Sequence, residues 1–221
     1  MNWSEIDTVL LDMDGTLLDL HYDNRVWNEL VPAAFAQLRE LSLAAAKEQL
    51  LDHMRRIHGS IEFYSFDYWC AYTGLDLVAV HKQATTLITY RPGALEFLRW
   101  LKRSGRKTII ATNAHRDSLM VKEAHSGICK EVDAVVSSHD YAAPKESHQF
   151  WQRLGEAFHF QPQCSLFIDD NEPVLDSAAS YGISHLRCVS RPDSRRPARA
   201  GLRYPCLDHF KEICPGIAAK S

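Results

Sequence analysis

Two aspartates separated by one residue follow an apolar run near the start of the chain. Thr8–Leu11 leads directly into Asp12-Met13-Asp14-Gly15-Thr16. A carboxylate can attack phosphorus and form an aspartyl-phosphate, which divides one difficult hydrolysis into two easier steps. A second carboxyl group close by can protonate the leaving oxygen and later take a proton from water. Asp12 is therefore the candidate nucleophile, and Asp14 is the candidate general acid and base.

Polar residues also follow three later apolar runs, at the place where each predicted strand ends. They are Thr112 and Asn113, then Lys145, and then the pair Asp169 and Asp170. Because the carboxyl ends of parallel strands meet at one edge of a sheet, these side chains should share one crevice with Asp12. Each one alone is as well explained by a turn or a helix cap. Their order and shared position favour a catalytic site.

The charge of this predicted crevice calls for a cation. A phosphate dianion beside Asp12 and the aspartate pair would bring about five negative charges together at low dielectric, and Lys145 supplies one positive charge. Mg²⁺ suits a site of a few carboxylates, phosphate and water, and another divalent cation such as Mn²⁺ could substitute. The predicted ligands are Asp12, the backbone carbonyl of Asp14, Asp170, and Asp169 either directly or through water.

The remaining polar residues are predicted to contact phosphate. The Thr112 hydroxyl and the Asn113 amide can donate hydrogen bonds to phosphate oxygens as charge develops on them, and the Lys145 ammonium neutralises part of that charge. Thr112 and Lys145 therefore count as both catalytic and phosphate-binding residues.

Five short apolar runs lack the alternation of a half-exposed strand, so they fit strands buried on both faces. Helical patterns separate the later runs, with Pro at a helix start or Gly just past a helix end. This alternation predicts an α/β fold, a Rossmann-like parallel sheet with helices on both faces. The five runs are 8–11, 107–111, 132–136, 165–168 and 185–189.

Residues 18–90 interrupt the alternation, because they contain helical spacing and no convincing buried strand. We therefore predict a helical cap domain at 18–90, inserted into a catalytic core formed by residues 1–17 and 91–221. Near the end of the chain, the Arg- and Pro-rich segment 190–203 predicts a surface loop, and a last short helix is expected near 207–213.

Composition, charge and cysteine usage are those of a soluble globular protein, and we expect a cytoplasmic enzyme that acts on small molecules. The 221 residues are 46% hydrophobic and 24% charged, with a formal net charge of -3, which points to neither nucleic acid nor membrane as a partner. The N-terminal residues lack the features of a signal peptide. Six cysteines without a Cys-x-x-Cys pair indicate reduced thiols. The expected assembly is a monomer or a weak homodimer.

The four motifs together resemble those of the haloacid dehalogenase (HAD) superfamily of phosphatases. Asp12-Met13-Asp14-Gly15-Thr16 is the most specific of them, and Thr112, Lys145 and the aspartate pair match the other three. The resemblance implies the HAD core fold and identifies the insertion with the superfamily's first type of cap (C1), which closes over the site and selects the substrate. Asp169 stands where many members have Gly, which leaves open which carboxylate touches the metal.

Within the superfamily the chain resembles bacterial GMP/IMP 5'-nucleotidases, which implies a purine nucleoside 5'-monophosphate as substrate. An aromatic stretch between Phe63 and Tyr72 could offer a base-stacking surface, although most of its rings would ordinarily form the core of the cap. His115 and His139 lie near the predicted crevice and could contact the substrate or the cap, or simply cap a helix. The stretches that carry the resemblance are Asp23–Glu29, Thr112–Arg116, Ser137–Asp140 and Phe167–Leu175.

Other functions fit the same motifs less well. A sugar-phosphate or other small-metabolite phosphatase, or a phosphomutase, would carry the same residues and differ in its substrate or phosphoryl acceptor. A metal-free dehalogenase needs neither Asp14 nor the aspartate pair. A signalling receiver has its acidic pair after the first strand and no cap, and a non-catalytic phosphate-binding scaffold would have no reason to keep every motif.

Overall fold

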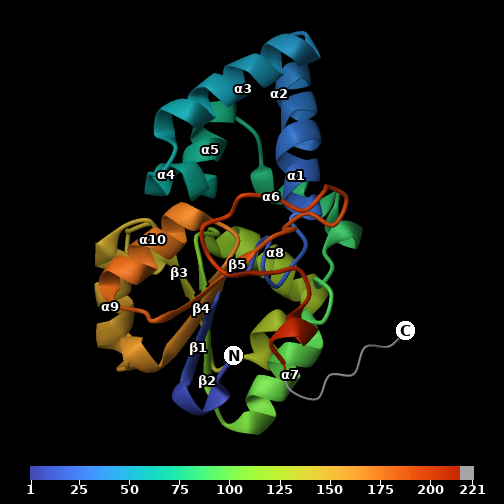
Figure 1. The fold of residues 1–221 in the computed structure, drawn as a ribbon. Coiled ribbons are helices and arrows are strands. Elements are labelled where there is room, and N and C mark those ends of the chain that lie inside the picture. The colour runs from blue at the N-terminus through green and yellow to red at the C-terminus, as the bar shows by residue number, and fades with distance from the viewer. Residues whose placement is uncertain (215–221) are drawn as a thin grey trace.

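A six-stranded sheet forms the centre of the molecule in the computed structural model, which describes residues 1–214 (Figure 1). All neighbouring strands pair in parallel, in the order β3-β2-β1-β4-β5-β6. The chain leaves β1 in one direction and later returns to its other side at β4, so a crevice opens at the carboxyl ends of these two strands. The strands are β1 (Thr8–Leu11), β2 (Lys107–Thr112), β3 (Ala134–Ser137), β4 (Ser165–Asp169), β5 (His185–Val189) and β6 (Cys206–Leu207).

Helices cover both faces of the sheet, as the fold prediction requires. Val9 and Leu11 of β1 pack in one apolar cluster with α7 and α8, whereas Leu10 between them packs in a second cluster with α9 and α10. This division follows from the strand geometry, in which successive side chains point to opposite faces. The predicted α/β fold, a Rossmann-like parallel sheet with helices on both faces, is confirmed. The four helices are α7 (Ala94–Ser104), α8 (Arg116–Ser126), α9 (His148–Phe158) and α10 (Glu172–Tyr181).

Residues 18–90 form a separate group of helices that stands over the carboxyl ends of the strands, at the top of Figure 1. Side-chain caps fix several helix starts: Ser42 accepts a hydrogen bond from the backbone of Ala45, and Asp76 does the same for Ala79. A π-helical turn at Val26–Leu30 joins the first two helices. The helices are α1 (His21–Arg25), α2 (Val31–Arg39), α3 (Leu43–Ile57), α4 (Ile61–Tyr64), α5 (Phe66–Thr73) and α6 (Leu77–Lys82).

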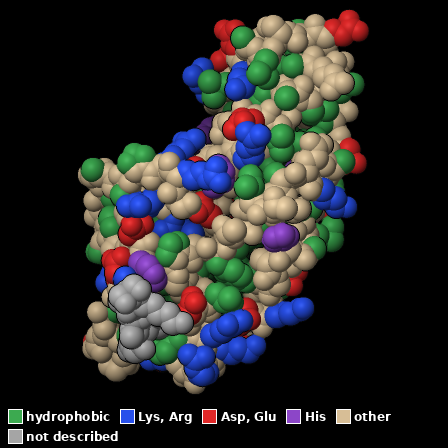
Figure 2. Space-filling model, turned by 90° about the vertical axis from the view of Figure 1, so that its right-hand side faces the viewer, with side chains coloured by type: hydrophobic (Ala, Val, Ile, Leu, Met, Phe, Trp, Pro, Cys, Tyr) green, Lys and Arg blue, Asp and Glu red, His purple; other side chains and the backbone are tan. Residues whose placement is uncertain are grey.

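This helical segment meets the core along a boundary rich in charge, which Figure 2 shows as charged side chains gathered where the narrower part joins the broader one. The loop at 190–203 lies against this boundary. Asn24 of α1 donates a 2.7 Å hydrogen bond to Asp193 of the loop, and the Leu20 amide donates to the Pro192 carbonyl at 3.0 Å. Through these two hydrogen bonds, the Arg- and Pro-rich loop stabilises the position of the start of the helical segment.

The last predicted helix is only partly present. The sequence favours a helix near 207–213, but Cys206–Leu207 forms β6 beside β5, and only a single 3₁₀ turn follows at Phe210–Glu212. Pairing with the exposed edge of β5 decides the outcome, because it satisfies backbone groups that a short isolated helix would leave open. Among the described residues 1–214, no helix is long and apolar enough to cross a membrane.

Candidate active site

Asp12 is the first residue after β1, and the sheet fixes its place. Leu11 lies in register with Ile110 on one side and Ile168 on the other, so the ends of three strands stand side by side. The Asp12 amide continues this pairing by donating to the Ile168 carbonyl at 2.9 Å. Asp12 is buried, with 5% of the residue exposed. The candidate nucleophile therefore sits at the base of the crevice, in line with Asp169.

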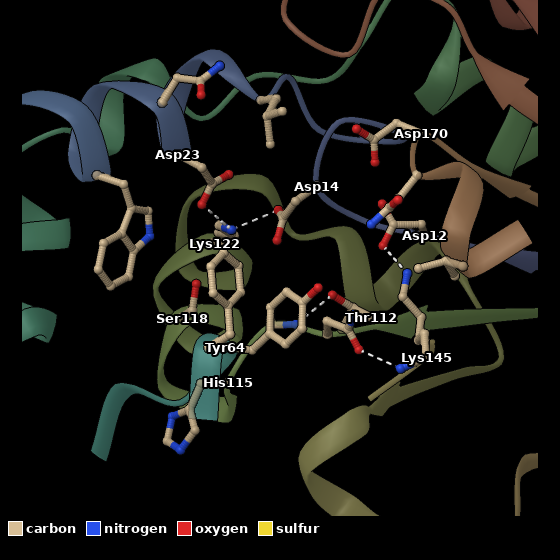
Figure 3. Close-up of a pocket in the computed structure, with 18 of the residues that line it drawn as sticks. Asp12, Asp14, Asp23, Tyr64, Thr112, His115, Ser118, Lys122, Lys145 and Asp170 are labelled. Carbon is tan, nitrogen blue, oxygen red and sulfur yellow. Dashed lines mark hydrogen bonds and ion pairs between the residues drawn. The ribbon is translucent and has the colours of Figure 1, made fainter. Parts of the chain in front are cut away.

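Lys145 reaches into the same place from the loop after β3. Its Nζ lies 2.5 Å from Asp12 Oδ1 and 2.7 Å from Asp169 Oδ2, and the residue is buried (Figure 3). The backbone of Lys145 is held at both ends: its amide donates to Asn113 Oδ1, and its carbonyl accepts from the indole of Trp151. An ammonium at this depth is stable only when paired, and here two carboxylates pair with it.

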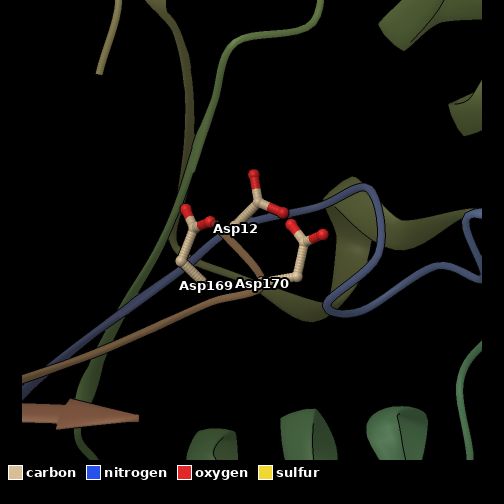
Figure 4. Close-up of side chains that lie close together, drawn as sticks. All are labelled: Asp12, Asp169 and Asp170. Carbon is tan, nitrogen blue, oxygen red and sulfur yellow. The ribbon is translucent and has the colours of Figure 1, made fainter. Parts of the chain in front are cut away.

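Three carboxylates converge at the crevice, with ligand oxygens from Asp12, Asp169 and Asp170 all within 4.8 Å of one another (Figure 4). Burial raises the pKa of Asp12 and of Asp170 to about 7, and it raises that of Asp169 to about 6 against the opposing effect of Lys145. Such shifts mean that burial disfavours the charged form of these carboxylates by more than their positively charged partners offset.

The oxygens of this cluster are not equivalent. Asp169 uses both of its oxygens within the protein, because Oδ2 accepts from Lys145 and Oδ1 accepts from the Asn171 amide at 2.7 Å. Asp12 Oδ2 is buried and has no hydrogen-bond partner. A buried oxygen without a partner is costly, and a divalent cation with oxygen ligands would satisfy it. The residues present therefore fit the predicted metal.

Gly15 allows the loop after β1 to pass close to this cluster. Its φ is +84°, and a Cβ added there would stand 2.9 Å from Asp170 Cγ and 3.0 Å from Pro192 Cβ. On the other side, Arg199 donates a 2.6 Å hydrogen bond to the Asp170 carbonyl. The loop and Arg199 together fix the position of Asp170.

Asp14 lies beside a lysine that the sequence reasoning missed. Lys122 of α8 places its Nζ 2.7 Å from Asp14 Oδ1 and 2.8 Å from Asp23 Oδ1, as Figure 3 shows. Asp23 belongs to α1 and so to the helical segment. No motif in the sequence marks Lys122, because a lysine inside an amphipathic helix is usually a solvated residue. Here it is 1% exposed.

Thr112 and Asn113, the predicted phosphate-binding pair, both line the cavity, since Thr112 is the last residue of β2 and Asn113 follows it. Thr112 Oγ1 accepts from the Ala114 amide at 3.0 Å, which leaves its proton free to be donated. The Asn113 carboxamide donates one of the two N–H groups of its Nδ2 to Glu146 Oε2 at 3.0 Å. Tyr64 of the helical segment donates to the other oxygen of the same carboxylate at 2.6 Å.

A cavity of about 400 Å³ extends from these residues into the helical segment, within the usual size of small-ligand sites. Part of the predicted aromatic surface faces it, namely Phe63, Tyr64, Phe66 and Trp69. Tyr68 and Tyr72 do not line this cavity and instead stack on the ring of His53. The sequence reasoning missed Trp27, Met54 and His58, which also line it.

The two candidate histidines differ in their position. His115 lines the cavity and stacks on Phe66 of α5 at 5.7 Å with nearly parallel rings, so it contacts the helical segment. His139 packs edge-on against His115 and does not line the cavity. His115 also caps a helix, as the alternative expectation had it, because its Nδ1 accepts a hydrogen bond from the Asp117 amide at the start of α8.

Comparison with known proteins is consistent with the fold and with the carboxylate cluster. A family model for haloacid dehalogenase-like hydrolases matches residues 6–182. That range runs from β1 to the end of α10 and includes all four strand-end motifs. The chain belongs to the haloacid dehalogenase-like hydrolase family.

Individual relatives support the same assignment. Over 215 residues the chain is 36% identical to the Escherichia coli K12 protein named GMP/IMP nucleotidase YrfG, with 97% of each chain covered. The structure of a HAD phosphatase from Thermococcus onnurineus superposes with a TM-score of 0.78 at 19% identity, covering 94% of this chain and 96% of that one. An L-2-haloacid dehalogenase from Xanthobacter autotrophicus gives a TM-score of 0.53 at 21% identity, covering 84% and 78%. The resemblance seen in the motifs is confirmed.

Gly15→Ala should destabilise the protein more than Gly105→Ala. Both glycines have positive φ, so either change costs about 1 kcal/mol of backbone strain. Only Gly15 has neighbours that an added Cβ would strike, while the space around Gly105 is open. Urea unfolding of both variants measures the difference, and equal losses of stability would show that the close approach to Asp170 has no consequence.

The stabilisation that Mg²⁺ gives should grow with pH. In the folded, metal-free protein the pKa values of Asp12 and Asp170 are near 7 instead of the ordinary 3.8, so the stability they contribute is complete below pH 3.8 and is lost as pH rises through 7. A divalent cation such as Mg²⁺ would bind their ionised forms and should therefore reverse this loss.

The measurement is the free energy of unfolding in chelator and in saturating Mg²⁺, compared between about pH 5 and pH 8. The buried His81, whose pKa is lowered to about 3, acts in the opposite direction below 6.5, but its contribution cancels in the difference. A stabilisation by Mg²⁺ that stays constant or falls with pH would contradict the assignment of the cluster.

Proposed function

We propose that this protein is a Mg²⁺-dependent phosphomonoester hydrolase that acts on purine nucleoside 5'-monophosphates, GMP and IMP, through an aspartyl-phosphate on Asp12. The observation that carries the proposal is the buried carboxylate cluster around Lys145, with one unpaired oxygen on Asp12. The choice of nucleotide rests on the 36% identity to a protein named GMP/IMP nucleotidase over nearly the whole of both chains.

The metal would be held by Asp12, by Asp170 and by the Asp14 carbonyl. The carboxylate oxygens of Asp170 accept no hydrogen bond from the described residues, whereas both oxygens of Asp169 are already engaged. We therefore assign Asp170 as a direct ligand and Asp169 as a residue that acts through water while it orients Lys145. A bound Mg²⁺ would neutralise phosphate charge and align the phosphoryl group.

The first chemical step transfers the phosphoryl group to the protein. A carboxylate oxygen of Asp12 attacks phosphorus, and a new O–P bond forms while the bond to the leaving 5'-oxygen breaks. Asp14 gives its proton to that oxygen, so the nucleoside leaves as a neutral alcohol. Thr112 donates a hydrogen bond and Lys145 supplies a charge to the phosphoryl oxygens as negative charge develops on them.

The second step restores the enzyme. Asp14, now ionised, takes a proton from a water molecule as that water attacks phosphorus, and the bond to Asp12 breaks to release inorganic phosphate. The helical segment over the crevice would exclude bulk water, which strengthens the electrostatic interactions inside. Residues 18–90 therefore act as the cap in this proposal, with residues 1–17 and 91–221 as the catalytic core.

The cavity suits a purine nucleoside. Trp27, Phe63 and Trp69 supply aromatic surface in the part of the cavity formed by the helical segment, and bases bind favourably to such faces. Nucleoside monophosphates are metabolites of the cytoplasm, and five of the cysteines are free thiols, namely Cys70, Cys129, Cys164, Cys188 and Cys206. We infer a cytoplasmic enzyme on these grounds.

Replacing the nucleophile should stop turnover, and replacing the acid should slow it strongly, while the fold remains in both variants. Asp12→Asn removes the nucleophile and one repelling charge, and Asp14→Asn removes an acid worth about 10² to 10⁴ in rate. Phosphate release and circular dichroism measure the two effects, and Asp12→Ala guards against slow reversion of Asn to Asp. Turnover above background in Asp12→Ala would exclude the covalent mechanism.

Among candidate substrates, GMP and IMP should give the highest kcat/KM. Both purines present a 6-oxo acceptor and an N1–H donor, and AMP reverses this pattern, so a site that pairs with both groups would reject it. The assay is phosphate release from a panel of nucleotides, sugar phosphates and phospho-acids under equal conditions. A sugar phosphate that exceeds GMP and IMP by about tenfold, or about 1.4 kcal/mol, would keep the phosphatase and remove the nucleotidase.

A further inference from the structure

Lys122 is a fully buried cation that has no role in the two proposed chemical steps. It lies in the middle of α8, is 1% exposed and still lines the catalytic cavity. The ring of Tyr22 lies 5.5 Å from its Nζ, and two carboxylates, Asp14 and Asp23, are within 2.8 Å. Taking an ammonium out of water is expensive, and apolar residues often replace buried ion pairs without loss of stability. Its position beside the proposed acid therefore suggests a function beyond packing.

The contact is made to one oxygen of Asp14 only. Asp14 Oδ1 is buried and forms an ion pair with Lys122 Nζ at 2.7 Å, although the geometry is not that of a hydrogen bond, and the residue as a whole lines the cavity with its side chain 20% exposed. The carboxyl group therefore meets the cavity through Oδ2, as Figure 3 illustrates. Because the Lys122 ammonium is positively charged and has no acceptor, it disfavours a proton on Oδ1 and favours one on the oxygen that faces the cavity.

Asp23 ties the same lysine to the helical segment. Asp23 Oδ1 accepts a hydrogen bond from Lys122 at 2.8 Å. Asp23 belongs to α1, the first helix of the cap. The ammonium thus bridges the acid in the core and a carboxylate that comes with the cap. When α1 is in this position, Lys122 is held from both sides and cannot swing away from Asp14.

We propose that Lys122 is a positioning residue that holds Asp14 Oδ1, directs the proton on Oδ2 toward the leaving oxygen, and is itself held by Asp23 of the cap. This inference rests on the proposed function, in which Asp14 protonates the leaving group. Lys122 transfers no proton and touches no reacting atom in this scheme. Its effect should therefore appear only in the step where the leaving oxygen needs a proton.

The test is the dependence of kcat/KM on leaving-group basicity, measured with substituted phenyl phosphates of similar size. For these substrates kcat/KM reports steps up to the first phosphoryl transfer, and poor leaving groups depend most on the acid. Asp14→Asn provides the reference for a site without the acid. The variants are Lys122→Met, which keeps the length without charge, Lys122→Arg, which keeps the charge, and Asp23→Asn, which removes the tie to the cap.

Lys122→Met should lower kcat/KM by about 10² for the most basic leaving group and by less than about tenfold for p-nitrophenyl phosphate, so its plot becomes nearly as steep as that of Asp14→Asn. Lys122→Arg should retain the wild-type slope even where its rate falls. A uniform loss across the series in Lys122→Met would reduce Lys122 to a structural residue and overturn the inference.

Asp23→Asn keeps the test decisive if Lys122→Met does not fold. Lys122→Met leaves the carboxylates of Asp14 and Asp23 without their cation, whereas Asp23→Asn removes one buried negative charge and leaves Lys122 paired with Asp14. It should steepen the plot in the same direction, and a wild-type slope would contradict the proposal. Failure of the proposed function looks different: the wild-type protein itself would release no phosphate, or Asp14→Asn would have the wild-type slope. In either case the comparison with Lys122 would lose its reference.

Discussion

The ammonium of Lys145, buried between the carboxylates of Asp12 and Asp169, is the interaction on which the crevice depends. The parallel register of β1 and β4 brings these two carboxylates together at adjoining strand ends, where their repulsion would otherwise be strong. The loop that carries Lys145 is fixed by Asn113 and Trp151, so the cation is delivered at a set depth. Without that cation, the nucleophile would have no neutralising partner within the described chain until a metal bound.

A second buried ion-pair cluster, formed by Lys122 with Asp14 and Asp23, also lies at the catalytic cavity. Lys122 serves Asp14 and Asp23 much as Lys145 serves Asp12 and Asp169, and each lysine is almost fully buried. The two ion-pair clusters divide the work of the proposed reaction, because one holds the nucleophile and the other holds the acid. They differ in that the second includes a residue of the helical segment. The position of that segment can therefore affect proton transfer as well as access to the cavity.

Much of the site could be predicted from the sequence because it stands at strand ends. In a parallel sheet the residue after each strand has a known place, so Asp12, Thr112 and the pair Asp169 and Asp170 could be assembled without a structure. Lys122 and Trp27 could not, since each lies within a helical pattern where nothing distinguishes a residue facing the cavity from one facing solvent. The strand β6 was missed for a related reason, as two residues carry no periodicity and only pairing with β5 defines them.

Rapid-quench mass spectrometry during turnover of GMP tests the central claim most directly. The account predicts that phosphate appears on Asp12 before inorganic phosphate is released, that hydroxylamine removes it as expected of an acyl phosphate, and that Asp14→Asn slows both its formation and its loss. A phosphorylated residue other than Asp12 would contradict the assignment of the nucleophile. So would single-turnover release of phosphate in which no phosphoenzyme forms, although the enzyme is fully active.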